Sequence, residues 1–369
     1  MNILHLTTYY YPHIYGAENF TYHLAEYQAK NESNHVWVIT GRWNTIWKTS
    51  ENINRVHVIR TWVAKIRYIQ TILAIIPFYV QAVRLIKQEK IDVVHAHIYP
   101  SLIVGALLKQ QNQKLIITIQ GGDIGDYYES FGPFRKLARK IIGLCLQKAD
   151  LVHCVSTYLA REVIKMGVKK EKIIIVPNGV DINKFKIKTS VIKNDHRIKL
   201  ISTSRLEEKN NLIYLIKLIY TLRQDNFAVS LDIYGTGSLE KQLQSEINIF
   251  KLQKYVNLKG YINHDQLANI LPSYNYFIRL STQEGFGISF IEAMSCGVIP
   301  IGTPIGGIPD IIIDHQNGFL VPLDGNEVKT FESIFSNQGQ QTKIALAARE
   351  TVIQKFNWDS ILPTIMTYY

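Results

Sequence analysis

The chain has 369 residues, more than one ordinary hydrophobic core can hold, so we expect two domains. With 47% hydrophobic and 19% charged residues, the composition is that of a folded globular protein. The three scattered cysteines lack C-x-x-C spacing, which argues against a disulfide framework or a zinc site and suits a reducing cytosol. The opening M-N-I-L-H-L predicts a strand rather than a signal peptide, and no apolar stretch has the length of a membrane span. We therefore expect a cytoplasmic protein.

The net charge of +11 is concentrated in one half of the chain. Residues 1–180 hold 22 Lys and Arg against 12 Asp and Glu, whereas residues 181–369 hold 19 against 18. A basic bias confined to one half indicates an anionic partner there, and no nucleic-acid motif accompanies it. An anionic membrane surface or an acidic acceptor fits better. Aromatic and basic residues mix between Trp62 and Lys90, as in interfacial segments, although an ordinary amphipathic helix packed on a sheet is the alternative.

Strand-like apolar runs alternate with helix-sized segments along the chain. In the first half the runs lie at residues 2–7, 35–40, 55–60, 91–97, 115–120, 151–156 and 172–177. After a polar, lysine-rich stretch from about Asn178 to Arg197, the alternation restarts at residues 199–204, 229–234, 256–261, 276–280 and 298–302. Continuous apolar strands followed by helices predict parallel, doubly wound sheets. We expect α/β architecture with two Rossmann-like domains, in which ligands bind beyond the carboxyl ends of the strands.

Candidate binding residues follow strands of the first half. Gly16 comes after the first strand, where glycine leading into a helix can admit phosphate, although an ordinary turn is the alternative. His95 and His97 lie on one face of the strand I-D-V-V-H-A-H and point together either into a cleft or into the core. Without a third ligand nearby in the sequence we predict no metal site there. Gln120 and Asp123 stand at the end of the next strand.

The second half has cations and glycines at its strand ends. Arg205 and Lys209 follow the run at residues 199–204 and are able to clamp a diphosphate, with arginine binding in bidentate fashion. A solvated charge run, in which Glu207 and Glu208 pair with these cations, is the alternative. The next strand end carries two glycines typical of a nucleotide-side loop, Gly235 and Gly237.

The most informative stretch is Q-E-G-F-G-I-S-F-I-E-A, in which Glu284 and Glu292 flank a glycine-rich turn. The turn joins a buried strand to a segment with helical spacing. Gly285 and Gly287 allow close approach of a ligand to the backbone, and the start of the helix favours phosphate. A carboxylate on either side of a diphosphate-sized turn matches the layout of a sugar nucleotide.

Together these motifs resemble glycosyltransferase family 4, whose members are retaining enzymes of the GT-B fold. The G-A-E loop, I-D-V-V-H-A-H, P-N-G-V-D, S-R-L-x-x-K, Y-G-T-G, E-G-F-G-x-x-x-x-E-A and G-G-I-P-D occur in the family's order over nearly the whole chain. The resemblance implies an acceptor domain at residues 1–180, a sugar-nucleotide domain at 181–355, and a final helix at 356–369 that returns to the first domain.

The resemblance also assigns roles. Arg205 and Lys209 bind the diphosphate, Glu284 contacts hydroxyls of the donor sugar, and Glu292 takes those of the ribose. The remaining donor contacts are implied for Gly16, Gly235, Gly237, Ile262, Gly285, Phe286, Gly287 and Ile288. His97, Gln120 and Asp123 fall on the acceptor side. Gln120 stands where many members have a histidine. Because an amide cannot act as an acid or a base, we expect Gln120 to be a binding residue only.

The expected activity is retaining sugar transfer from a UDP-sugar, or from GDP-mannose, to a lipid-linked or surface-polysaccharide precursor. The resemblance implies no cofactor and no divalent metal, because cations and helix ends stabilise the leaving diphosphate. A GT-B epimerase or phosphorylase is the enzymatic alternative, and a sugar-nucleotide sensor is the non-enzymatic one.

Overall fold

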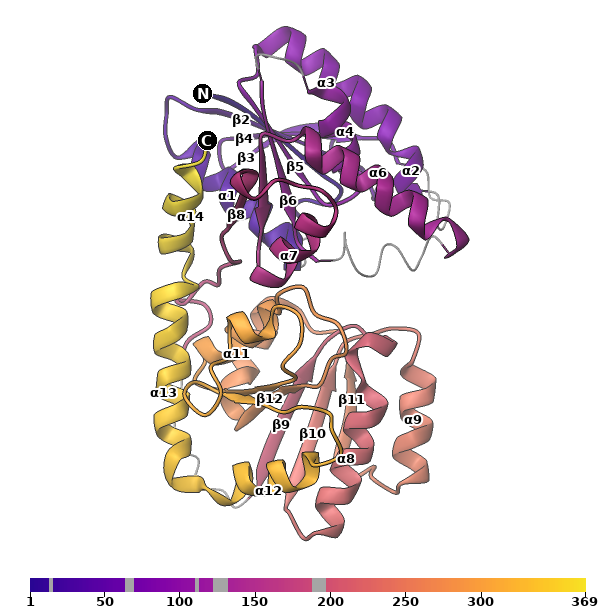
Figure 1. The fold of residues 1–369 in the computed structure, drawn as a ribbon, viewed down its shortest axis with the longest axis vertical. Coiled ribbons are helices and arrows are strands. Elements are labelled where there is room, and N and C mark those ends of the chain that lie inside the picture. Colours follow the sequence, from indigo (N-terminus) through magenta and orange to yellow (C-terminus); the bar gives the residue numbers. More distant parts are fainter. Residues whose placement is uncertain (13–15, 64–69, 110–112, 122–131, 188–196) are drawn as a thin grey trace. The chain divides into compact units, whose positions relative to one another are not determined.

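A computed structural model describes the chain except for residues 13–15, 64–69, 110–112, 122–131 and 188–196. It divides into two compact units (Figure 1). The first comprises Met1–Asn178 together with Ile361–Tyr369, and the second comprises Gly179–Ser360. The observed division therefore falls two residues before the expected one at 180, and the last nine residues join the first unit.

In the described part of the first unit, eight strands form a sheet in the order β3-β4-β2-β1-β5-β6-β7-β8. All neighbours are parallel except β3 and β4. The strands are β1 (Asn2–Thr7), β2 (His35–Gly41), β3 (Ser50–Ile53), β4 (Val56–Thr61), β5 (Val93–His97), β6 (Lys114–Ile119), β7 (Leu151–Cys154) and β8 (Ile173–Ile175). The helices are α1 (Gly16–Ala29), α2 (Gln70–Leu73), α3 (Ile75–Glu89), α4 (Ser101–Leu108), α6 (Arg135–Lys148) and α7 (Thr157–Lys165).

The second unit repeats the design with a parallel sheet of six described strands in the order β11-β10-β9-β12-β13-β14. The strands are β9 (Ile198–Thr203), β10 (Val229–Tyr234), β11 (Val256–Gly260), β12 (Tyr276–Arg279), β13 (Ile299–Gly302) and β14 (Phe319–Leu320). The helices are α8 (Leu212–Gln224), α9 (Glu240–Ile249), α10 (His264–Ile270), α11 (Ile288–Ser295), α12 (Glu327–Ser336) and α13 (Gln338–Lys355). Helix α14 (Trp358–Met366) begins at the end of this unit and continues into the residues that belong to the first unit. The prediction of two parallel-sheet α/β domains is confirmed.

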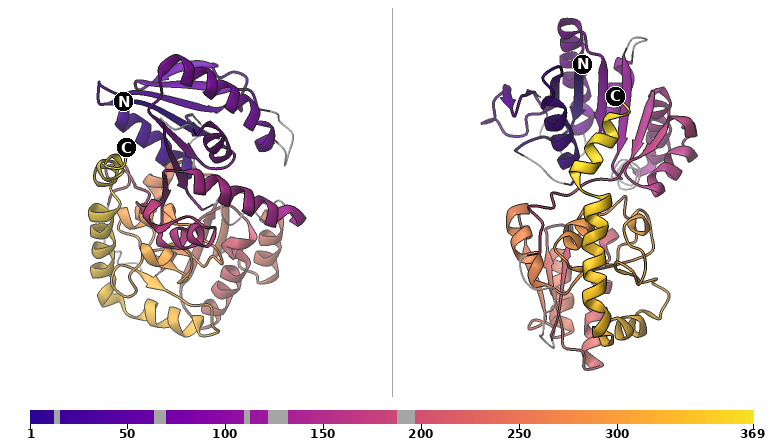
Figure 2. Two further views of the ribbon diagram at one scale, coloured as in Figure 1. Left: turned by 45° about the horizontal axis from the view of Figure 1, so that its top comes forward. Right: turned by 90° about the vertical axis from the view of Figure 1, so that its left-hand side faces the viewer.

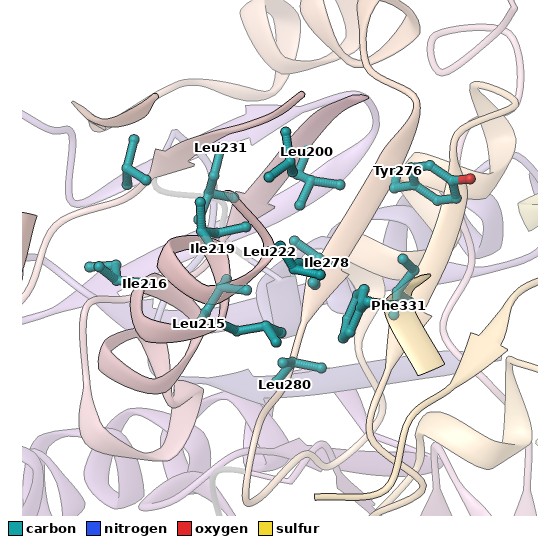
Figure 3. Packing of buried hydrophobic residues seen from close by; sticks show 14 of the residues in the cluster. Leu200, Leu215, Ile216, Ile219, Leu222, Leu231, Tyr276, Ile278, Leu280 and Phe331 are labelled. Carbon is teal, nitrogen blue, oxygen red and sulfur yellow. The ribbon is translucent and has the colours of Figure 1, made fainter. Parts of the chain in front are cut away.

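Apolar side chains at helical spacing explain why the second unit packs as it does. In α8, Leu215, Ile219 and Leu222 recur every three or four residues, so they share one face. That face is fully buried against Leu231 of β10 and Phe331 of α12 (Figure 3). Burying each such side chain contributes roughly 1.5–3 kcal/mol. The core thereby fixes the strands whose carboxyl ends carry the polar loops.

The end of the chain is the pair of yellow helices α13 and α14 (Figure 2). Helix α13 packs against α11 and β13 in the second unit. The last residues belong to the first unit, where Gln28 donates to Met366 Sδ at 3.4 Å and the hydroxyl of Tyr369 bonds His95 Nδ1. None of the helices in the described ranges is long and apolar enough to cross a membrane.

Candidate active site

The candidate site lies at the carboxyl ends of β9 and β12, the two central strands of the second sheet. Chain connections run outward in opposite directions from this pair, so it is the topological switch point at which open α/β sheets bind ligands. The loops after the two strands are joined, because Thr282 N donates to Lys209 O at 2.8 Å. The loop after β13 joins them through Gly307 N, which donates to Glu284 O at 3.0 Å. The predicted motifs at residues 205–209, 284–292 and 306–310 thus converge.

The Glu284 carboxylate is held by Arg279, the last residue of β12. The two form an ion pair, and each side chain is 13% exposed. The guanidinium also donates from Nε to Ser281 Oγ at 3.1 Å and from Nη1 to Ser289 Oγ at 2.8 Å. Burial lowers the pKa of Arg279 to about 10, which leaves it charged at neutral pH. Arg279 therefore fixes both the carboxylate of Glu284 and the first turn of α11.

Sequence reasoning missed Arg279. The only hint was a lone cation in the otherwise apolar run Y-F-I-R-L, and its partner five residues later became evident only when the turn was folded. A single charge at a strand end is usually solvated, whereas this one is largely buried and paired.

The turn after Glu284 leads directly into α11. Gly287 precedes the helix with φ of +105°, a left-handed conformation that side-chain-bearing residues rarely adopt. The amides at the start of a helix have no partner within it, so the first turn of α11 can donate to an anion. Phe286 N already donates to Glu284 Oε1 at 3.3 Å, and the Phe286 ring is buried beside Phe356. The buried side chain of Phe286 is therefore not available to a ligand, and the backbone contact implied by the family stays a prediction.

Glu292 lies in the second turn of α11 and is 5% exposed. Burial raises its pKa, while the charges of His264 and Lys184 oppose that rise. His264 Nδ1 lies 3.6 Å from Glu292 Oε1. A capping box at the start of α10 positions the histidine, because Asn263 Oδ1 accepts from Gln266 N at 2.9 Å and Gln266 Oε1 accepts from Asn263 N at 3.4 Å. The carboxylate of Glu292 is thus a buried acceptor.

The two cations after β9 share Glu207. Arg205 Nη1 lies 3.0 Å and Lys209 Nζ 3.8 Å from its carboxylate oxygens. The sequence left open whether Glu207 pairs with these cations, and the structure shows that it does. The Arg205 side chain is 67% exposed, and ion pairs at such exposure are worth about 0–1 kcal/mol. An anionic ligand that accepts two hydrogen bonds from the guanidinium can therefore displace this contact.

The other predicted donor residues take up varied positions. In the loop after β10, Gly235 has φ of +141°, and a Cβ there would lie 1.8 Å from Ser204 O, so this glycine allows the loops after β9 and β10 to touch. Gly237 lies two residues further on, and Ile262 is half-buried after β11. Gly16 is the first residue of α1 in the other unit.

Three residues were predicted to lie on the acceptor side, and the structure describes two of them, His97 and Gln120. His97 is fully buried in the sheet of the first unit, not at an exposed strand end, and its Nε2 lies 3.0 Å from His5 Nδ1. Gln120 follows β6 and accepts from Asn178 Nδ2 at 2.9 Å. Asp123 lies outside the described residues.

His97 belongs to a buried layer of four histidines: His5, His95, His97 and His153. Thr118 Oγ1 links two of them, at 2.6 Å from His95 Nε2 and 3.0 Å from His153 Nδ1. Burial lowers the pKa of His5 and of His153 to about 4 and holds those of His95 and His97 well below the ordinary value.

His5 is the third histidine that sequence reasoning did not find near His95 and His97. One nitrogen of each lies within 4.8 Å of the others, close enough for a shared metal ion. His5 uses both ring nitrogens in hydrogen bonds, to His97 and to Gln28 Oε1 at 2.6 Å. An ion here would have to break the hydrogen bonds of His5, whereas the buried Nδ1 of His97 has no hydrogen-bond partner among the residues that the structure describes.

Two largely parallel sheets, a helix start whose amides can donate to an anion, and paired cations at a switch point are typical of α/β proteins that bind nucleotides. Comparison with known families is more specific. The model "Glycosyltransferase Family 4" matches residues 14–184, and "Glycosyl transferases group 1" matches residues 183–351. The chain belongs to the GT-B glycosyltransferases of the family 4 type.

Individual relatives are distant. The chain is 26% identical over 260 residues to a phosphatidylinositol N-acetylglucosaminyltransferase subunit of Arabidopsis thaliana, covering 68% of this chain and 56% of that protein. It is 27% identical over 285 residues to the putative colanic acid biosynthesis glycosyltransferase WcaL of Salmonella typhimurium, covering 73% and 68%. The chain thus spans about half the length of the Arabidopsis relative.

Solved structures share the fold. Sucrose-phosphate synthase from Thermosynechococcus elongatus has a TM-score of 0.87 at 19% identity, with 100% of this chain and 98% of that chain covered. Anabaena HepE in complex with UDP and glucose has a TM-score of 0.79 at 19% identity, covering 99% and 98%.

Proposed function

We propose that the protein transfers a sugar from a nucleoside diphosphate sugar to a glycan acceptor, with retention of anomeric configuration. The observation that carries the proposal is the convergence, at one switch point, of Arg205, Lys209, the start of α11 and the carboxylate of Glu284. Two cations and a helix end suit a diphosphate. A carboxylate beside them suits sugar hydroxyls, because an ionised carboxylate only accepts hydrogen bonds.

Each group has a distinct part in this proposal. Arg205, Lys209 and the backbone of residues 285–288 stabilise the leaving diphosphate, an electrostatic role that needs no divalent ion. Glu284, oriented by Arg279, positions the donor sugar, and buried Glu292 accepts from the ribose hydroxyls. The donor's own phosphate takes the proton of the acceptor hydroxyl as the new glycosidic bond forms on the face the diphosphate leaves. Acceleration then comes from charge stabilisation and from positioning.

A UDP-sugar is the favoured donor, supported by the likeness of the fold to HepE solved with UDP-glucose, and GDP-mannose is the second candidate. The favoured acceptor is a lipid-linked or surface-polysaccharide precursor. The names of the colanic acid and phosphatidylinositol relatives support that class. Such an acceptor implies a cytoplasmic protein with access to the membrane.

A thermal-shift panel of UDP-glucose, UDP-N-acetylglucosamine, GDP-mannose and ADP-glucose tests donor binding. A true donor at a hundred times its dissociation constant stabilises the protein by about 2.7 kcal/mol. Incubation of the hit with and without a glycan acceptor separates a transferase from an epimerase, which acts without acceptor, and from a sensor, which leaves the donor intact. Absence of any shift across the panel would reject the proposal.

A further inference from the structure

Helix α6 of the first unit has two apolar faces. Ile142 faces the core and is 1% exposed. A second set, Phe134, Leu137, Ile141 and Leu144, is 66%, 56%, 41% and 52% exposed, with Phe134 just before the helix. The intervals of three and four residues place these four side chains in one stripe along the helix. Contiguous exposed apolar surface of this kind marks an interaction site.

The charges of α6 are all of one sign. The helix contains no aspartate or glutamate, and its basic residues are Arg135, Lys136, Arg139, Lys140 and Lys148. The first four are exposed, around the half of the stripe formed by Phe134 and Leu137. Glu162 of α7 lies 3.9 Å from Arg139 and offsets part of this charge. The surface combines exposed apolar side chains with a clear excess of cations.

Neighbouring helices extend the surface. Helix α4 contacts both α3 and α6, so the three lie side by side over the sheet (Figure 1). On α2 and α3, the side chains of Ile72, Ile76 and Val80 are 42%, 68% and 40% exposed at intervals of four residues. Leu107 at the end of α4 is 55% exposed. Exposed apolar residues therefore occur on each helix of this layer.

We propose that the outer surface of α2, α3 and α6 binds an anionic lipid bilayer, with the α6 stripe at headgroup depth and the flanking cations on lipid phosphates. Amphipathic helices with basic flanks bind in this way. A protein partner fits less well, because lysine is depleted at protein interfaces and Lys136 and Lys140 flank the stripe. The surface lies partly outside the segment from Trp62 to Lys90 that the sequence suggested. This membrane-binding proposal rests on the proposed function in one respect: binding to the bilayer would give the site access to a lipid-linked acceptor.

Flotation of the full chain with vesicles tests the proposal. The vesicles are phosphatidylcholine alone or phosphatidylcholine with phosphatidylglycerol, at low and high salt. Wild-type protein should float with the anionic vesicles and dissociate at high salt. Each basic residue near an anionic surface is worth about fivefold in partition, so Lys136→Ala/Lys140→Ala should weaken binding about 25-fold.

A matched pair of variants isolates the stripe. Leu137→Ser/Leu144→Ser should weaken binding by tenfold or more. Ile249→Ser/Leu346→Ser changes side chains that are 66% and 51% exposed in the second unit and should bind as wild type. Failure of wild type to float with anionic vesicles, or equal loss in both pairs, would overturn the proposal. A thermal-shift measurement with UDP on the same samples shows whether each variant is folded and whether it binds the nucleotide. Failure to bind vesicles can therefore be distinguished from failure of the proposed function.

Discussion

Acidification should unfold the first unit well before its carboxylates titrate, because the four buried histidines must stay neutral in the folded state. The pKa of His5 and of His153 is about 4 when folded, against 6.5 for an unperturbed histidine. The unfolded chain therefore binds more protons between these two values. Stability is fully present above pH 6.5 and is lost as pH falls toward 4.

The size of the loss follows from those pKa values. Each histidine with a folded pKa of about 4 lowers the unfolding free energy by about 1.2 kcal/mol between pH 7 and pH 5.5. His5 and His153 together therefore remove about 2.5 kcal/mol over this interval, and His95 and His97, whose pKa values burial also lowers, add to the loss. One or two kcal/mol is already a large fraction of the stability of many domains.

Urea unfolding at a series of pH values measures this effect. Tryptophan fluorescence suits the assay, because Trp37, Trp43, Trp47 and Trp62 belong to the first unit and only Trp358 to the second. Replacing His153 by Asn should reduce the pH slope by about one proton. Constant stability from pH 7 to pH 5.5 would refute the argument.

Three further predictions concern the site. Arg279→Met should cost about 3–5 kcal/mol in urea unfolding, the range for breaking a buried ion pair, and adding Glu284→Met should recover part of it; additive losses would show that the two residues are not coupled. Because burial raises the pKa of Glu292, its charge opposes folding at neutral pH, so Glu292→Gln should raise the melting temperature and weaken donor affinity; unchanged affinity would remove it from the ribose site. Transfer activity should survive EDTA, and a loss restored by a divalent ion would contradict the metal-free mechanism.

Apart from the short strands β3 and β14, the sequence was sufficient to predict the two sheets and the loops at the carboxyl ends of their strands, because these follow from local periodicity and from glycine placement. It could not reveal Arg279 or the histidine layer. The ion pair of Arg279 depends on a turn that brings Glu284 back toward the end of β12, the strand that carries Arg279. The layer depends on the pairing of β1 with β5, which places His5 opposite His95. Such contacts between distant or folded-back segments leave no periodic pattern.

The α6 surface shows a related limit. The basic excess of the first half was visible in the composition, but the helix that carries the exposed apolar stripe was not. Periodicity alone places apolar residues on a helix face without saying whether a sheet covers that face. In α6 one apolar face is covered and another is exposed, which only the packed structure distinguishes.

Isothermal titration of UDP-sugar into wild type, Arg205→Ala and Arg55→Ala tests the central claim most directly. The two arginines are matched in exposure, since each is 67% exposed, and each forms an ion pair with a glutamate. The account predicts binding to wild type, a loss of about 1.5–3 kcal/mol for Arg205→Ala, the range for a charged hydrogen bond, and no change for Arg55→Ala. Wild-type affinity in Arg205→Ala, or equal weakening in both variants, would contradict the assignment of the diphosphate to this site.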